Sequence, residues 1–206
     1  PASRPAVPLG GGGHSAPPCL AVLTVDVAAR GWEMEAAACL ERHGVVSLPA
    51  LLSAQQLAEI AEAVALADTD PATADFVRLT RNAEGRVHKA LPLGGNGREA
   101  LSAVTATLWP VMRRVLQTAR PPLVGAGWMR ISPGAERQSL HKDVRGYDRH
   151  PATGELAACY DVPRALSVQV QLSDTAGATL DAPVGALEVL PGSHRPDGRH
   201  GGRGAV

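Results

Sequence analysis

The stretch Gly185-Ala-Leu-Glu-Val-Leu-Pro-Gly-Ser-His194, read together with Ser139-Leu-His-Lys-Asp143, says most about the fold of this chain. Residues 185–190 form a short apolar run before a Pro-Gly pair, which is typical of a strand that ends in a turn. In the other stretch, His141 and Asp143 are two residues apart, so on an extended backbone their side chains point to the same face. An imidazole and a carboxylate can then share one cation, and two histidines with one carboxylate suit Fe(II).

Length and composition limit the class of protein. The chain has 206 residues, of which 20 are basic and 20 are acidic, so its formal net charge is zero. Its charge therefore gives no indication that it binds nucleic acid or an anionic membrane. Aromatic residues make up 3%, too few for the stacking surfaces that bind single-stranded nucleic acid. No apolar run approaches the ~20 residues of a transmembrane helix. We expect one domain over residues 19–206.

The first residues and the cysteines bear on the compartment. Residues 1–18 are rich in Pro, Gly and Ala and predict a flexible leader, although a transit peptide would have a similar composition. Cys19, Cys39 and Cys159 are odd in number and widely spaced, unlike a disulfide framework or a zinc ribbon. We interpret them as buried or incidental thiols in a reducing compartment, which favours the cytoplasm and leaves organelle targeting as an alternative.

Helices are expected in the first half of the chain. Residues 20–27 predict a strand, and apolar residues at helical spacing predict a helix over 32–42 that stops at Gly44. After a short apolar strand at 45–48, Ser53 is a favourable N-cap, and a glutamine three residues later completes a capping box. The helix behind it is expected to bury one face, made by Leu57, Ile60, Ala61 and Val64.

A longer helix and then strands follow. Residues 75–97 are polar and mixed, whereas 98–117 carry apolar residues at helical spacing that predict a core-facing stripe, with Pro110 as a kink or break: Leu101, Val104, Leu108, Met112 and Val115. Strands are expected at 124–131, 165–172 and 185–190, with a turn at Pro133-Gly134. Helices first and strands later indicate an α+β domain whose catalytic part is an all-β sandwich or barrel.

Three stretches of the chain form a pattern when they are taken together. The first is His43-Gly-Val-Val-Ser-Leu-Pro-Ala-Leu-Leu-Ser-Ala-Gln-Gln-Leu57. The second is Pro133-Gly-Ala-Glu-Arg-Gln-Ser-Leu-His-Lys-Asp143, and the third is Val168-Gln-Val-Gln-Leu-Ser-Asp174 followed by the Pro-Gly-Ser-His stretch. In their order and spacing they resemble the phytanoyl-CoA dioxygenase family of Fe(II)- and 2-oxoglutarate-dependent oxygenases, and they cover most of residues 43–195. His-x-Asp alone is a weak motif, and the combination is stronger.

The resemblance implies a double-stranded β-helix, a cupin-like jelly roll, with flanking N-terminal helices. It implies iron held by His141, Asp143 and a distal histidine, with 2-oxoglutarate as cosubstrate and ascorbate as a further candidate cofactor. Trp128 and Gln169 would fall on strands that line the cosubstrate pocket, and the backbone of Lys142 would lie near it. The expected reaction is hydroxylation of a small organic substrate by O2, coupled to decarboxylation of 2-oxoglutarate to succinate.

The distal part of the family pattern does not match. In relatives the distal histidine and the arginine that binds 2-oxoglutarate lie on strands well beyond Pro-Gly-Ser-His, whereas only His200 and Arg203 follow it here. Either C-terminal strands are missing from this chain, or His200 substitutes, or the site is incomplete. In relatives the histidine of Pro-Gly-Ser-His is usually structural.

Two other functions therefore stay open. One is a truncated or catalytically dead jelly roll that acts as a binding or scaffold module. The other is a cupin-like metal-binding protein without 2-oxoglutarate. The sequence gives no indication of the substrate's identity or of the oligomeric state.

Overall fold

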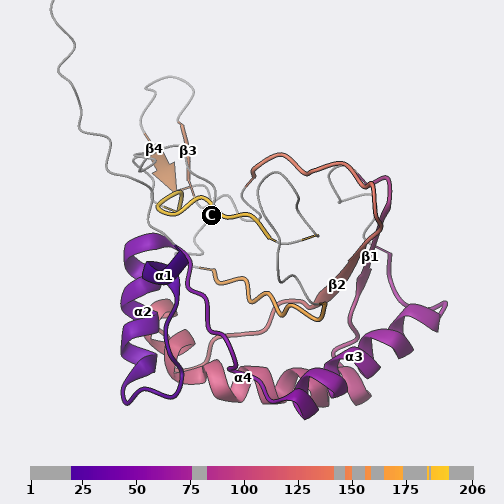
Figure 1. Cartoon of the computed structure of the whole chain (residues 1–206), viewed down its shortest axis with the longest axis horizontal. Helices are drawn as coiled ribbons and strands as arrows, with labels where there is room; N and C mark the ends of the chain where they lie inside the picture. The colour runs from indigo at the N-terminus through magenta and orange to yellow at the C-terminus, as the bar shows by residue number, and fades with distance from the viewer. Residues whose placement is uncertain are drawn as a thin grey trace, which may run out of the picture.

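The computed structural model describes residues 20–75, 83–141, 147–149, 156–158, 165–173, 185 and 187–194. The leader predicted over residues 1–18 lies outside this part of the chain. The described helices are α1 (Leu20–Leu23), α2 (Trp32–His43), α3 (Ala54–Thr69) and α4 (Gly95–Leu116). The described strands are β1 (Arg86–Ala90), β2 (Gly127–Ile131), β3 (Tyr147–Arg149) and β4 (Leu156–Ala158). Figure 1 shows how these elements are arranged.

Helix α4 connects the two hydrophobic clusters of the domain. Its first half packs with α3 and the β1–β2 pair, and its second half packs with α1 and α2, as Figure 1 shows. The predicted stripe is confirmed: Val104, Leu108 and Val115 are buried, and Leu101 and Met112 pack against the clusters. Fully burying one such side chain contributes about 1.5–3 kcal/mol. The stripe therefore joins both ends of the helical layer.

Pro110 lies inside α4, which continues through it. The alternative of a break at this position is therefore wrong. A proline removes the backbone donor that would bond to the carbonyl four residues earlier, and the packing of Val111 and Val115 maintains the helix beyond it. Among the described residues, no helix is both long and apolar enough to cross a membrane, in agreement with the sequence.

The capping box of α3 is present as predicted. The Gln56 backbone N–H donates to Ser53 Oγ at 3.2 Å, and the Ser53 N–H donates to Gln56 Oε1 at 2.8 Å. The buried face differs slightly from the predicted one, since Ile60, Ala63 and Ala67 are buried while Ala61 is exposed. The spacing of the apolar residues determines how wide the apolar face is. The elements that pack against the helix determine which residues at its edges are buried.

The beginning of the described chain differs from its prediction. The sequence predicts a strand over residues 20–27, but residues 20–23 form the short helix α1. Of the predicted strand, only an isolated parallel bridge between Thr24 and Ser47 is present. The Val25 N–H donates to the Ser47 carbonyl at 3.0 Å, and the Ser47 N–H donates to the Leu23 carbonyl at 2.7 Å. This bridge is also all that forms of the strand predicted at 45–48.

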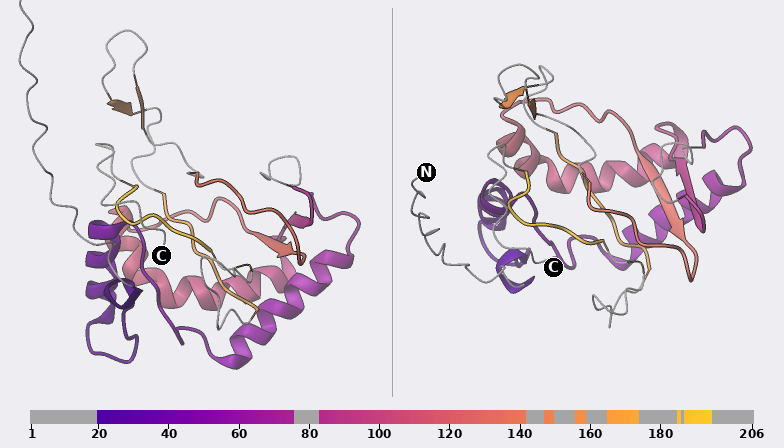
Figure 2. Two further views of the ribbon diagram at one scale, coloured as in Figure 1. Left: turned by 45° about the horizontal axis from the view of Figure 1, so that its top comes forward. Right: turned by 90° about the horizontal axis from the view of Figure 1, so that it is seen from above.

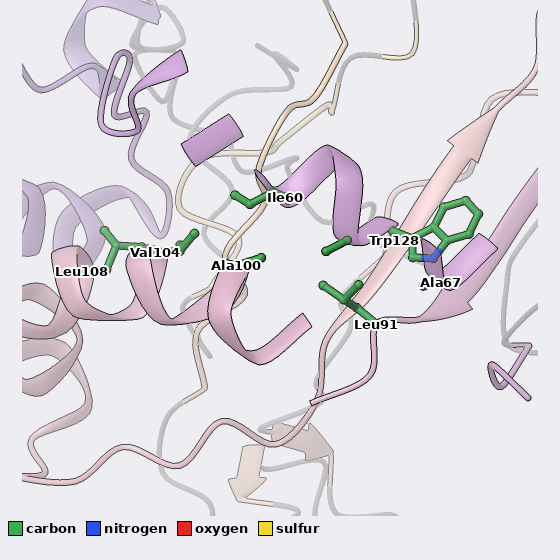
Figure 3. Close-up of a cluster of buried hydrophobic side chains, with 8 residues drawn as sticks. Ile60, Ala67, Leu91, Ala100, Val104, Leu108 and Trp128 are labelled. Carbon is green, nitrogen blue, oxygen red and sulfur yellow. The ribbon is translucent and has the colours of Figure 1, made fainter. Parts of the chain in front are cut away.

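Strands β1 and β2 form an antiparallel pair with Lys89 opposite Trp128 and Val87 opposite Arg130. β2 lies within the predicted strand at 124–131, whereas β1 lies in a stretch that the sequence predicts only as polar and mixed. Trp128 is buried with Leu91 and the facing side chains of α3 and α4, as Figure 3 shows. This pair therefore covers one end of the helical layer.

The region expected to hold the barrel strands has few described ladders. β3 and β4 pair antiparallel, with Tyr147 opposite Ala158. Segments 165–173 and 187–190 run over α4 in Figure 2. The described residues form no ladder there, and the strands at 165–172 and 185–190 stay predictions. Of the alternating apolar residues predicted there, Leu166 and Val170 pack against the hydrophobic clusters, whereas Val168 and Leu172 are 46% and 42% exposed. The jelly roll stays a prediction.

Candidate metal centre

The segment that leads to His141 begins at the end of β2. The Ser132 N–H donates to the Gly85 carbonyl at 2.8 Å, which continues the β1–β2 pairing beyond its last pair. The predicted turn follows: Gly134 has φ of 83°, and the Ala135 N–H donates to the Ser132 carbonyl at 3.1 Å. A glycine adopts this left-handed conformation without the steric cost of a side chain. The turn redirects the chain back over the helices.

The imidazole of His141 is exposed and turned toward its own backbone. Nδ1 lies 2.7 Å from the Ser139 carbonyl oxygen. Because a carbonyl only accepts, the neutral ring must carry its proton on Nδ1, which leaves the lone pair on Nε2. Metal-binding histidines are commonly held in this way, with one ring N–H donated to a carbonyl or carboxylate. The contact with Ser139 therefore indicates the Nδ1–H tautomer, in which Nε2 is the nitrogen that would bind a metal.

The other predicted ligands lie outside the described residues: Asp143, His200 and the neighbouring Lys142. Within the described part of the chain, no group of three or more His, Cys, Asp or Glu side chains is placed to hold a metal ion. Of the predicted ligands, the described residues thus include the His141 imidazole, whose Nδ1–H tautomer fits a divalent metal.

The two residues predicted to line the cosubstrate pocket lie in different surroundings. Trp128 is 8% exposed and faces α3 and α4, where it forms part of the hydrophobic core (Figure 3). Gln169 is exposed, and its Nε2 donates to Ser167 Oγ at 3.0 Å. The structure therefore does not bring these two side chains into one pocket. The opposite face of β2 carries Met129 and Ile131, each 40% exposed.

The Pro-Gly-Ser-His turn lies against the C-terminus of α2. The Gly192 N–H donates to the His43 carbonyl at 2.7 Å, and His194 Nε2 donates to the Glu41 carbonyl at 3.2 Å. These carbonyls have no partner within the helix, so the turn satisfies acceptors that would otherwise need water. Within this structure His194 is a helix-capping residue, in keeping with the structural role that the resemblance implies.

The same segment contacts the His141 loop. Glu188 forms an ion pair with Arg137, four residues before His141. Next to Arg137, the Glu136 carbonyl accepts a hydrogen bond from the Arg86 guanidinium on β1. Gly185 lies near Ile131 at the end of β2. Residues 185–194 therefore connect the end of β2, the His141 loop and the C-terminus of α2.

A group of charged side chains that the sequence did not indicate surrounds the end of α3. Asp68 Oδ2 accepts from Arg130 at 2.7 Å, and Lys89 Nζ lies 3.5 Å from Asp68 Oδ1 and 2.9 Å from the Asp68 carbonyl. The hydrogen bond from Arg130 holds the pKa of Asp68 below its usual value, partly opposed by burial. Arg130 also lies 5.8 Å from the Trp128 ring centroid. These contacts bind α3 to both strands.

Cys39 is the one cysteine within the described residues. It is buried, and its thiol lies 3.3 Å from the Val45 carbonyl oxygen. Burial raises the pKa of this thiol, which makes the nucleophilic thiolate scarce. Of the thiols predicted to be buried or incidental, Cys39 is buried, while Cys19 and Cys159 lie outside the described residues.

A shallow hollow of about 520 Å³ lies at the C-terminal end of α4, and His141, Trp128 and Gln169 are not among its lining residues. Its lining is local to the helix end: Pro110, Arg113, Arg114, Gln117, Thr118 and Ala119. The partial negative charge at a helix C-terminus opposes the binding of an anion by these arginines. The hollow is therefore not a second candidate site.

Comparisons of the chain with protein-family models, with curated proteins and with solved structures find no match.

Proposed function

We propose that this chain is an Fe(II)- and 2-oxoglutarate-dependent oxygenase that hydroxylates a small organic substrate, with His141 and Asp143 as metal ligands. The observation that carries the proposal is the Nδ1 hydrogen bond from His141 to the Ser139 carbonyl, because it presents Nε2 for coordination. The resemblance of the surrounding segments to the phytanoyl-CoA dioxygenase family supplies the rest. The jelly roll, the distal ligand and the cosubstrate are parts of this proposal.

In this proposal the side chains have simple tasks. His141 binds through a neutral ring and Asp143 through an ionised carboxylate, so acid weakens metal binding by protonating both. The Ser139 carbonyl orients the imidazole. Bound iron would supply the oxidising chemistry, in which decarboxylation of 2-oxoglutarate is coupled to hydroxylation of the substrate. The protein must exclude water and place the reacting C–H bond.

A second candidate is a cupin-like metal-binding module that does not use 2-oxoglutarate. One observation favours it: of the residues assigned to the cosubstrate pocket, Trp128 is buried in the core and Gln169 is exposed, so these two side chains do not share one pocket. This candidate shares the metal ligands with the first. The two are therefore separated by the cosubstrate and not by the metal.

Anaerobic titration of the purified protein tests both candidates. Co²⁺ or Fe(II) is added first, and 2-oxoglutarate is then added to the metal-loaded protein. We expect His141→Ala and Asp143→Ala to weaken metal binding by more than about tenfold. The matched control is His88→Ala, which removes an imidazole from β1 and should leave the affinity unchanged. His200→Ala shows whether this histidine completes the ligand set.

The visible spectrum separates the two functions. The oxygenase predicts a weak charge-transfer band when 2-oxoglutarate is added to the Fe(II)-loaded protein, and succinate on admission of air. The metal-binding module predicts metal affinity with no such band. Unchanged metal affinity in both His141→Ala and Asp143→Ala would exclude both functions.

A further inference from the structure

We propose that Glu188 is a positioning residue for His141 and acts through Arg137. The inference deepens the proposed function and rests on it for its meaning, since it explains how the loop that carries the metal-binding imidazole is held. Neither residue is expected to contact the metal. Their task is to fix the backbone from which the imidazole and its orienting carbonyl extend.

The first step is the contact itself. Arg137 Nη2 and Glu188 Oε2 form an ion pair between two segments that are 51 positions apart. The Glu188 side chain is 20% exposed and that of Arg137 is 56% exposed, so the carboxylate end is the better shielded one. A pair with one shielded partner is screened less by salt than a pair that is exposed on both sides. The contact can therefore restrain the loop.

The second step is the short distance along the chain from this contact to the imidazole. Ser139, whose carbonyl accepts from His141 Nδ1, is two residues after Arg137 and two before His141. A displacement of the backbone at Arg137 thus moves the acceptor and the ring together. On the other side of Arg137, the Arg86 guanidinium holds the Glu136 carbonyl. The loop is therefore anchored to β1 and to residue 188.

The third step is that Glu188 itself lies on an anchored segment. Six residues after Glu188, His194 caps the C-terminus of α2, and Gly192 bonds to the His43 carbonyl. Both acceptors belong to a helix whose packing against α1 and α4 is buried. The Glu188 carboxylate is therefore held in place relative to α2, and its ion pair with Arg137 restrains the His141 loop in turn.

Hydrogen–deuterium exchange of the metal-free protein tests this directly. We expect Glu188→Arg, which places two guanidinium groups together, to speed exchange of the peptide that covers residues 137–141 by about two- to fivefold, or about 0.4–1 kcal/mol. Arg137→Glu should do the same. The double charge swap should restore slow exchange. Glu188→Gln is the milder variant if the reversal prevents folding, and it should show a smaller increase.

The Arg130–Asp68 pair provides a matched control. The Arg130 side chain is 59% exposed, close to the value for Arg137, and its partner carboxylate is 28% exposed. Arg130→Glu should speed exchange at the end of α3 and leave residues 137–141 unchanged. Unchanged exchange of residues 137–141 in all three Arg137 and Glu188 single variants, or no recovery in the double swap, would overturn the inference.

Co²⁺ affinity is the second measurement and separates the two proposals. If the wild-type protein binds Co²⁺ through His141, Glu188→Arg should weaken binding about two- to fivefold and the double swap should recover it. If the wild type binds no Co²⁺ but exchange responds as expected, the proposed function fails and the positioning of His141 stands. If Co²⁺ binds through His141 and with equal affinity in the wild type and in the Arg137 and Glu188 variants, the positioning role fails and the proposed function stands.

Discussion

The His194 ring occupies the space that a side chain at Gly44 would need. A Cβ added to Gly44 would lie 2.8 Å from His194 Cβ and still closer to the ring. Gly44 also has φ of 76°, because it ends α2 in the left-handed conformation with its N–H bonded to the Leu40 carbonyl at 2.8 Å. Gly44 is therefore required twice: α2 ends there in the left-handed conformation, and the Pro-Gly-Ser-His turn packs against it.

Gly44→Ala should destabilise the protein by about 3 kcal/mol. The left-handed conformation costs a non-glycine residue about 1–2 kcal/mol, and the overlap with His194 adds a packing cost of about 1–3 kcal/mol. The measurement is the free energy of unfolding from urea denaturation. In a His194→Ala background the same change should cost only the conformational part, which a double-mutant cycle reports.

Two other glycines separate the conformational cost from the packing cost. Gly134 has φ of 83° with nothing within 4 Å of the position that a Cβ would take, so Gly134→Ala should cost about 1–2 kcal/mol. Gly125 has open space and no positive φ, so Gly125→Ala should change stability by no more than about 0.5 kcal/mol. A cost at Gly44 no larger than that at Gly134 would show that the contact with His194 contributes nothing.

Removal of the N-cap of α3 is the second prediction. Ser53→Ala should lower the free energy of unfolding by about 1 kcal/mol, because the Gln56 N–H loses its acceptor. Ser102→Ala is the matched control, since the Ser102 hydroxyl bonds to the Arg98 carbonyl inside α4, where alanine has the higher helix propensity. A loss at Ser102 equal to that at Ser53 would contradict the capping role.

Local signals of this kind are the part of the fold that the sequence reveals. The capping box at Ser53, the stop at Gly44 and the stripe along α4 all depend on residues within a few positions of one another. Strand β1 escapes prediction because its sequence, Arg-Val-His-Lys-Ala, contains a single large apolar residue, and its partner β2 begins 37 positions after it ends. Residues 20–23 form a helix where a strand is predicted because a short apolar run fits both equally well.

The candidate site is predictable to a different extent. The spacing of His-x-Asp predicts that His141 and Asp143 share one face of an extended chain. Alternation along a strand does not, however, determine which of its two faces meets a pocket. The pocket position expected for Trp128 depends on that choice, and its side chain lies on the face that packs against α3 and α4. The Arg137–Glu188 pair has no sequence signal, because it joins segments whose approach depends on the whole fold.

The third prediction concerns acid stability. Hydrogen bonding to Arg130 lowers the pKa of Asp68 in the folded protein below 3.8, its ordinary value. A carboxyl whose pKa is depressed by folding stabilises the protein above its unfolded pKa, and this contribution disappears as pH falls through the folded pKa. Asp68→Asn should therefore be less stable than the wild type at neutral pH. The difference in stability should shrink as the pH falls below the ordinary carboxyl pKa of 3.8.

Urea denaturation of both proteins from neutral pH to the acid range measures this difference. Asp70 follows two positions later, is exposed, and its carboxylate accepts only a local hydrogen bond from the Ala72 N–H among its described contacts, so Asp70→Asn is the control. A stability difference for Asp68→Asn that stays constant as the pH falls would show that the carboxylate charge does not contribute.

The last prediction is that two histidines of this protein carry opposite neutral tautomers. His141 uses Nδ1 toward the Ser139 carbonyl at 2.7 Å, whereas His194 uses Nε2 toward the Glu41 carbonyl at 3.2 Å. Since both acceptors are carbonyl oxygens, each of these ring nitrogens must carry the proton. Long-range ¹H–¹⁵N spectra at a pH where both rings are neutral should show His141 as the Nδ1–H form and His194 as the Nε2–H form.

Metal addition extends the same measurement. A diamagnetic ion such as Zn²⁺ should shift the Nε2 resonance of His141 and leave both nitrogens of His194 unchanged, because Nε2 of His141 holds the lone pair and Nε2 of His194 is engaged with α2. His141→Ala and His194→Ala assign the signals. An Nε2–H form at His141 would remove the geometric support for coordination at this residue, whatever the protein's affinity for metal.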